Sequence, residues 1–453
     1  MKKVLVTVAA LGLVAGVAST ASAVEWKMSG KYMVEGAYLS DAKGTGMDLT
    51  DDVTNDLNTS DAYFLHTFET NVGMKVNDKV SMNAVVRLAD DTFWGSQTGG
   101  DTAGGNNMAT DTTADVYVHQ LYMDYMSPIG KARFGRTPAG GYGTTFMDFD
   151  KRADRIMLWP VGLDKPWSTL FYVEKVKDKD VASNTVSDED STTYVARLYY
   201  NTDSTDAGIH YGYTNDQNTD NTIADRKQQL TAYGKFKMDN YFLNAELTHF
   251  FGEQDNDTDA SDADYDSWAG MLQIGGKFNN LTVSGTFFYA SGDDESVAGT
   301  DMENALGTSG TGDLYEPLYI LTGRHTGMLN NDIWGTNSAY TTNMSKSGVE
   351  AFVLAADYKV SDALTVHGAI GYAKADEANQ YSNAAHTTYA IGYAGHDDEY
   401  GWEYNIGAAY KLLDNLTYEA HFGYLDTGDY FKTTATTQTE NVYVLSHSLT
   451  MTF

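Results

Sequence analysis

Residues 441–453 read NVYVLSHSLTMTF, and apolar and polar side chains alternate along most of this stretch. One phase holds Tyr443, Leu445, Leu449, Met451 and Phe453, and the other holds Ser446, Ser448, Thr450 and Thr452. A period of two is typical of a β-strand whose two faces meet unlike media. The stretch therefore predicts a strand with one apolar and one polar face.

The two stretches before it repeat the pattern. WEYNIGAAYKLL at 402–413 and LTYEAHFGYL at 416–425 place large apolar residues in one phase and polar residues in the other. Asp414 and Asn415 separate the two as a tight turn. Strands of this kind fit a β-barrel whose outside meets lipid and whose inside meets water.

The start of the chain predicts export. Met1-Lys2-Lys3 is positively charged, residues 4–18 form an apolar run broken only by small residues and Thr7, and Ala21-Ser22-Ala23 is a small-x-small cleavage site. The run is shorter than the roughly 20 residues that a membrane-spanning helix needs. We expect a secretory signal peptide at 1–23, cleaved after Ala23, followed by one transmembrane β-barrel domain at 24–453.

The composition excludes several classes of protein. Lys2 and Lys3 are the only charged residues in the expected signal peptide. Residues 24–453 therefore contain 28 Lys and Arg and 62 Asp and Glu, which gives a net charge of −34. This balance argues against a nucleic-acid partner. The chain has no cysteine, which excludes disulfides, thiolate metal sites and Cys nucleophiles, and we expect no cofactor. The 5 Pro, 43 Gly and 32 Tyr fit many strands with tight turns and aromatic girdles.

A near-repeat marks one end of the expected barrel. A Lys, an apolar residue and a turn rich in Asp or Asn recur at 74–78, 234–236, 276–280, 358–362 and 410–415. Asn and Asp accept the left-handed backbone that short hairpin turns require. Long polar connections lie between these turns, at 40–60, 94–114, 178–190, 215–226, 253–265, 292–347, 375–400 and 426–440. Short turns at one rim and long loops at the other are typical of outer-membrane barrels.

The pattern predicts about 18 strands, with 16 as the alternative, and an even number in either case. Either number leaves an aqueous lumen. The apolar patch 387–395 is left in a loop. The predicted strands are 26–39, 61–76, 80–92, 115–126, 131–136, 153–159, 167–177, 192–201, 207–214, 228–238, 241–251, 267–278, 281–290, 349–359, 364–374, 401–412, 416–425 and 441–453.

Two elements resemble those of the general diffusion porins of Gram-negative outer membranes. The terminal strand that ends in Phe453 resembles the signal read by the outer-membrane assembly machinery. GKARFGR at 130–136 resembles the turn, strand and Gly-Arg element ahead of that family's third loop, which would run here from Thr137 to Asp154. The resemblance implies an antiparallel up-and-down barrel, a long third loop folded into the lumen, and a homotrimer in the outer membrane.

The expected pore constriction takes opposed charges from the third loop and the wall, because a transverse field in a narrow eyelet favours small polar solutes. Arg133 and Arg136 differ by an odd number of residues, so a regular strand cannot point both inward. We favour Arg136, after the strand loosens at Gly135. A solvated loop with neutralising ion pairs is the alternative for 148–155. The candidate residues are Arg87, Arg136, Asp148, Asp150, Lys151, Arg152, Asp154 and Arg155.

Other charged residues fall on the polar phase of their strands and are expected to line the pore: Lys27, Lys31, Glu69, Asp124 and Arg197. Residues 255–266 imitate the acid spacing of a calcium loop, but Ala260 occupies the position that needs Gly and Asp266 replaces a Glu. We interpret this run as a solvated acidic loop. The ten His residues form no ligand pair at helical spacing, so no metal site is predicted.

Together these features favour a water-filled channel for passive diffusion of small hydrophilic solutes and ions. Acidic loops at the outer mouth favour a weak preference for cations. Its expected partners are those solutes, outer-membrane lipids, its own copies in a trimer and the assembly machinery. An enzyme is disfavoured because clustered Ser/His or Asp/His motifs are absent from the sequence. The alternative is a barrel that acts mainly as a scaffold or sleeve for a protein partner, or as an adhesin.

Overall fold

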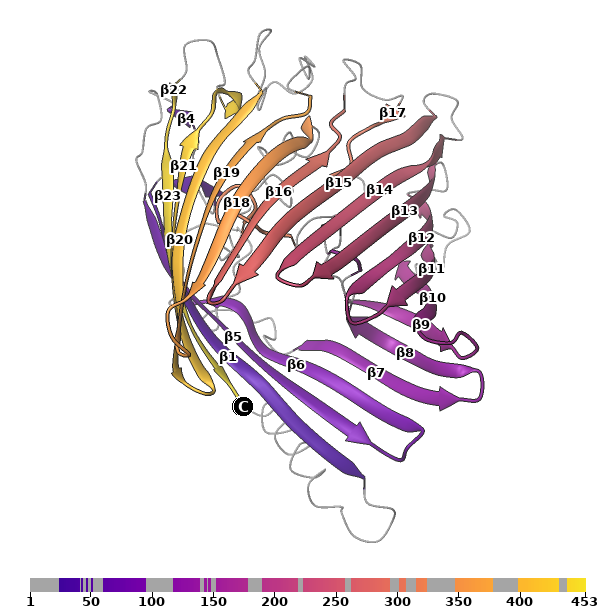
Figure 1. The fold of residues 1–453 in the computed structure, drawn as a ribbon. Helices are drawn as coiled ribbons and strands as arrows, with labels where there is room; N and C mark the ends of the chain where they lie inside the picture. Colours follow the sequence, from indigo (N-terminus) through magenta and orange to yellow (C-terminus); the bar gives the residue numbers. More distant parts are fainter. Residues whose placement is uncertain are drawn as a thin grey trace.

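The protein, in a computed structural model, is a wall of β-strands (Figure 1). Residues 1–23 and the patch 387–395 lie outside the described residues, and in the described part no helix is long and apolar enough to cross a membrane. The described residues are 24–40, 42–43, 46–47, 50–51, 60–94, 117–138, 142–144, 146–147, 152–177, 190–218, 223–256, 262–293, 301–306, 315–323, 347–377, 398–431 and 438–453.

One sheet of nineteen strands forms the wall. The short β17 (Asp301–Met302) joins it in parallel beside β15, and the others are antiparallel. These are β1 (Glu25–Leu39), β5 (Asp61–Lys75), β6 (Val80–Phe93), β7 (Tyr117–Ser127), β8 (Gly130–Pro138), β9 (Arg152–Pro160), β10 (Trp167–Lys177), β11 (Ser191–Asn201), β12 (Thr205–Asn218), β13 (Ile223–Met238), β14 (Tyr241–Asn256), β15 (Ala263–Phe278), β16 (Leu281–Ala290), β18 (Val349–Lys359), β19 (Leu364–Lys374), β20 (Glu399–Leu413), β21 (Leu416–Thr427) and β23 (Val442–Thr452).

These strands follow one another in chain order around the wall, and β1 pairs with both β5 and β23. The sheet is therefore a closed, antiparallel, up-and-down barrel of 18 strands, as predicted, and the alternative of 16 is set aside. Short pieces lie outside the wall: β2 (Ala42–Lys43), β3 (Gly46–Met47), β4 (Thr50–Asp51), β22 (Gln438–Thr439) and a 3-10 turn at Asp429–Phe431.

The predicted strand bounds agree with the structure to within a few residues at most ends. The largest differences are at the long-connection rim, where β13 begins at Ile223, β14 continues to Asn256 and β15 begins at Ala263. Arg226 stabilises this extension through ion pairs of 2.7 Å to both Glu253 and Asp255. Part of the acidic run 255–266 is therefore paired strand, and residues 257–261 lie outside the described part.

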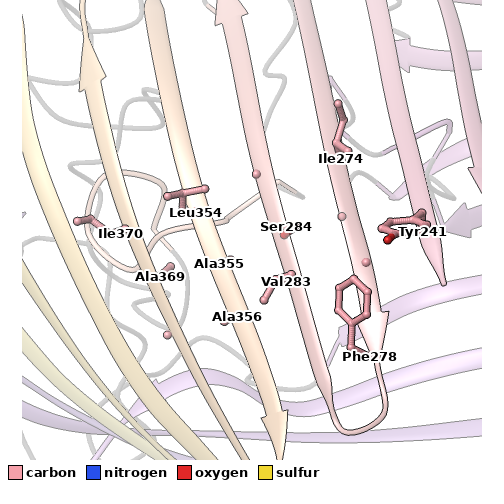
Figure 2. Close-up of a pocket in the computed structure, with 14 residues that line it drawn as sticks. Tyr241, Ile274, Phe278, Val283, Ser284, Leu354, Ala355, Ala356, Ala369 and Ile370 are labelled. Carbon is pink, nitrogen blue, oxygen red and sulfur yellow. The ribbon is translucent and has the colours of Figure 1, made fainter.

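The outward phase of the strands carries the large apolar side chains. Trp402, Tyr404 and Ile406 of β20 are all more than 40% exposed, whereas Glu403 between them is completely buried. Glycine and alanine thin this outward surface over β15, β16, β18 and β19, leaving a groove of about 740 Å³ beside Leu354 and Ile370 (Figure 2). The two faces thus suit lipid outside and a polar lumen inside.

Two of the near-repeats form short turns that are closed by an ion pair. Lys75 contacts Asp78 at 2.7 Å, and Lys359 contacts Asp362 at 2.8 Å, each three residues apart. The hydrogen bond from each lysine holds the pKa of its aspartate below the ordinary value. In the two-residue turns, Asp239 and Asn279 adopt left-handed backbone with φ of 52° and 53°, as hairpins of this length require.

The last residue completes the closure of the barrel. Phe453 N donates to Gly30 O at 3.1 Å, and Gly30 N donates back to Phe453 O at 2.9 Å. The Phe453 ring stacks on Phe68 of β5 with centroids 6.1 Å apart. Phe453 therefore ties the end of the chain to the first two strands of the wall.

Deleting Phe453 should lower the yield of protein in the outer membrane several-fold, because it removes these hydrogen bonds and the assembly signal that the family resemblance implies. Export should continue, since the signal peptide predicted at 1–23 is untouched. Quantitative blots of outer-membrane and periplasmic fractions measure both effects. Phe453→Tyr is the matched control and should retain the yield, and equal yields of the deleted and intact chains would contradict the prediction.

Candidate pore constriction

The connection between β8 and β9 is the third long connection, and its described residues, 142–144 and 146–147, turn into the barrel. We call them the third-loop segment. Tyr142 is 3% exposed, and its ring lies 4.8 Å from that of Tyr233 and 5.1 Å from that of His210. Both partners belong to the inward phase of β12 and β13. The loop is thus folded into the lumen, as predicted.

A wall carboxylate anchors this segment. Glu246 of β14 accepts hydrogen bonds of 2.7 Å from Thr144 N and Oγ1 on one oxygen, and one of 3.3 Å from Met147 N on the other. From β13, Lys235 Nζ donates to Gly143 O at 2.6 Å. Hydrogen bonds to charged groups are the strong ones. They fix the loop against β13 and β14.

A second inserted segment comes from the long connection between β16 and β18. Its residues 315–323 are the seventh-loop segment, and Leu318, Tyr319, Ile320 and Leu321 are at most 2% exposed. Glu403 of β20 accepts from Tyr319 N at 2.7 Å and Ile320 N at 2.8 Å on one oxygen, and from Leu321 N at 2.6 Å on the other. Three consecutive backbone donors therefore satisfy one buried carboxylate.

Side-chain packing and a polar network also hold the seventh-loop segment against the wall. A Cβ added at Gly371 of β19 would lie 2.5 Å from Leu318 Cδ1, so the glycine leaves room for that side chain against the wall. Tyr319 Oη lies 3.2 Å from His421 Nδ1 of β21, and His367 Nε2 lies 3.1 Å from the same nitrogen. Apolar contact and a polar network thus hold this segment against β19 to β21.

The two inserted segments meet inside the barrel. The ring of Phe146 lies edge-on to that of Tyr315 at 5.3 Å, and both rings contact Phe288 of β16. Phe146 and Phe288 are completely buried within one apolar cluster that also includes Leu306. In the described residues, the inserted segments therefore line the wall from β11 round to β21 and narrow the lumen from that side.

Paired charges occupy the facing wall. Arg87 of β6 contacts Glu69 of β5 at 2.8 Å, and Lys31 of β1 is the register partner of Glu69. Asp124 of β7 accepts two hydrogen bonds from Arg133, at 2.6 and 2.9 Å, and contacts Lys131 at 3.0 Å. Asp124 thus contacts two cationic groups, whereas Glu69 contacts Arg87 and lies opposite Lys31 in the strand register.

Two further arginines sit next to the third-loop segment, and neither is free. Arg155 of β9 forms a buried pair with Glu174 of β10 at 2.6 Å, and its Nη1 donates to Pro138 O, where the loop begins. Arg197 of β11 donates to His210 Nδ1 at 3.0 Å and lies 4.8 Å over the Tyr142 ring. These guanidinium groups position the loop.

The predicted constriction residues do not all point into the lumen at one place. Arg136 lies in the outward phase with Phe134, because pairing with Leu121 and Asp154 keeps the alternation through Gly135. Arg133 takes the inward position, so the prediction that Arg136 faces the lumen is wrong. Asp154 and Arg152 share the outward phase of Ile156. Asp148, Asp150 and Lys151 lie outside the described residues. The candidates in the inward phase are Lys27, Lys31, Glu69, Arg87, Asp124, Arg155 and Arg197.

Sequence reasoning did not identify the two carboxylates that anchor the loops. Glu246 and Glu403 each lie in the inward-facing phase of their strand, and this position alone predicts that they face the lumen. Their partners lie 82 to 102 residues away in the chain, so alternation alone could not assign the contact. The signal that could have pointed to these two anchors is a single acidic residue in the middle of the inward face of a strand.

Several solved structures share this architecture. The protein is similar to Pseudomonas aeruginosa OccK9 (OpdG), with 11% identity, a TM-score of 0.55 and coverage of 95% of this chain and 98% of that chain. It is also similar to Acinetobacter baumannii OccAB4, with 14% identity, a TM-score of 0.52 and coverage of 94% of this chain and 98% of that chain. A BenF-like porin from Pseudomonas fluorescens Pf-5 is similar with 12% identity, a TM-score of 0.52 and coverage of 94% of this chain and 99% of that chain. No protein-family model and no curated protein sequence matches the chain. The likeness shows the fold of outer-membrane porins.

Replacing Glu403 with Gln should loosen the seventh-loop segment, because an amide NH₂ would face a backbone donor in place of an oxygen. Losing one charge-assisted hydrogen bond costs about 1.5–3 kcal/mol, so amide exchange in residues 318–323 should accelerate about tenfold or more. Hydrogen–deuterium exchange with mass spectrometry measures this. Glu419→Gln, on the inward phase of β21, is the control and should leave the exchange unchanged. Unchanged exchange in Glu403→Gln would show that packing alone holds the segment.

Proposed function

We propose that this protein is an outer-membrane porin, a water-filled channel through which small hydrophilic solutes and ions diffuse passively. The observation that carries the proposal is the narrowing of a polar lumen by two loop segments fixed to its wall. A barrel of 18 strands is wide enough for an aqueous path. The charged clusters around Glu69 and Asp124 supply the polar wall opposite the inserted segments.

We also propose a weak preference for cations. Acidic residues gather at the long-connection rim, where Glu253 and Asp255 share one cation, Arg226. The lumen arginines Arg87, Arg133 and Arg155 each contact a carboxylate, so they attract anions less than unpaired arginines would. Mouth charge acts over a Debye length of about 10 Å at 0.1 M salt. The preference should therefore fade as salt rises.

Liposome swelling tests passive diffusion directly. Proteoliposomes should swell in isotonic solutions of small sugars, and the rate should fall steadily with solute size, because selection is by passage through a fixed constriction. Heat-denatured protein is the control. A rate no faster than in protein-free liposomes would favour the alternative of a sleeve or adhesin with no open path.

Reversal potentials measured across a KCl gradient test the proposed ion selectivity. The wild type should prefer K⁺ weakly at low salt, and Arg87→Gln should strengthen this preference because it frees the charge of Glu69. Arg136→Gln is the matched control, an arginine in the outward phase, and should change neither conductance nor selectivity. A firm anion preference of the wild type at low salt would contradict the role of the mouth charge.

We further propose that the protein assembles as a homotrimer in the outer membrane. The proposal rests on the family resemblance of the sequence, and the apolar outward faces of the wall offer surfaces for both lipid and subunit contacts. Semi-native gels of outer-membrane extracts should show a heat-resistant species of three chains. A single species at monomer size before and after crosslinking would contradict the trimer.

A further inference from the structure

A second feature of the lumen lies beside the third-loop segment. A cavity of about 370 Å³ opens in the inner wall formed by β10 to β14. It extends from His210, which contacts Tyr142, along β12 to Asp216, toward the long-connection rim. The cavity is therefore on the mouth side of the inserted loop. Its volume lies in the range of about 300–1,000 Å³ typical of small-molecule sites.

Hydroxyl and amide groups supply much of the cavity's polar surface. Thr193 Oγ1 and Thr214 Oγ1 lie 2.8 Å apart, and Gln229 donates from Nε2 to Thr231 Oγ1 at 3.1 Å, which leaves its carbonyl oxygen as an acceptor. Ser191 is 1% exposed, and its Oγ has no hydrogen-bond partner in the part of the chain that the structure describes. The cavity wall thus retains hydrogen-bonding capacity.

His210 adds a donor whose direction is fixed. Its Nδ1 accepts a hydrogen bond from Arg197 Nε at 3.0 Å, so the proton of the neutral ring is on Nε2. A Cβ added at Gly212 would lie 3.1 Å from that Nε2, which places the nitrogen beside a glycine that lines the cavity. Tyr172 and Phe250 contribute aromatic surface to the same cavity.

The charges of the cavity do not favour an ion. Asp216 and Lys227 line it with opposite signs. The Lys227 ammonium lies 4.7 Å over the Tyr265 ring and 4.0 Å from Asp225, so its charge is already engaged. The carboxylate of Asp216 can accept two hydroxyl hydrogen bonds. Closely spaced donors and acceptors beside aromatic rings match a compact ligand that carries many hydroxyl groups.

We propose that this cavity is a binding subsite for a neutral polyhydroxylated solute of monosaccharide size, held at the mouth side of the constriction. The inference deepens the proposed channel function and rests on it. Gln229, Thr193 and the Nε2 of His210 hydrogen-bond the solute, and Tyr172 and Phe250 cover its apolar faces. The subsite raises the local concentration of such solutes before they pass the third-loop segment.

Saturation-transfer NMR of the detergent-solubilised wild type with glucose tests binding without requiring conduction. The expected result is a saturable glucose signal that Gln229→Leu and Thr193→Val each weaken at least fivefold. Thr417→Val, an inward hydroxyl on β21, is the matched control and should bind glucose as the wild type does. A signal that survives both cavity variants, or no saturable signal, would overturn the subsite.

Single-channel currents separate the subsite from the channel. Glucose added at the long-connection side should produce concentration-dependent blocking noise that Gln229→Leu removes while the open conductance stays within about a fifth of the wild type. Gluconate and alanine, tested at the same concentrations, should produce less noise than glucose. Stronger block by either would overturn the choice of a neutral polyol. An open channel with no glucose effect would overturn the subsite alone, whereas absence of any open current would overturn the channel function.

Discussion

Closure of the sheet between β1 and β23 is the constraint on which the rest of the structure depends. Lipid offers no partner to a backbone N–H or C=O, so a spanning sheet must pair every strand on both sides. Nine register pairs, from Lys31↔Thr452 to Leu39↔Val444, make this closure. Once the wall is closed, alternation of side chains alone assigns apolar residues to the lipid and polar residues to the lumen.

The lumen then has to be narrowed by chain segments that have no strand neighbours of their own. Two wall carboxylates, Glu246 and Glu403, solve this by accepting backbone N–H groups of the inserted loops. An unpaired buried carboxylate is costly, and so are unpaired backbone donors, so each group satisfies the other. The arrangement leaves the facing wall, with Arg87 and Arg133 beside their carboxylates, as the charged side of the passage.

The strands could be predicted from the sequence because a period of two is a local property. WEYNIGAAYKLL assigns Glu403 to the lumen without any knowledge of its neighbours, and Asp or Asn turns set the ends of the hairpins. The contacts of Glu403 could not be predicted, because its partners are loop residues about 80 positions away. The choice between Arg133 and Arg136 failed for a different reason. Gly135 has a φ of 119°, yet the pairing on both sides keeps the alternation through it.

The central claim is that an open aqueous path remains beside the inserted loops. Single-channel recording of refolded wild-type protein in a planar bilayer tests it most directly. The account predicts stepwise insertions with a stable, ohmic open current at low voltage. A folded, heat-modifiable barrel that inserts yet carries no stable current would contradict it, because the loops would then close the lumen.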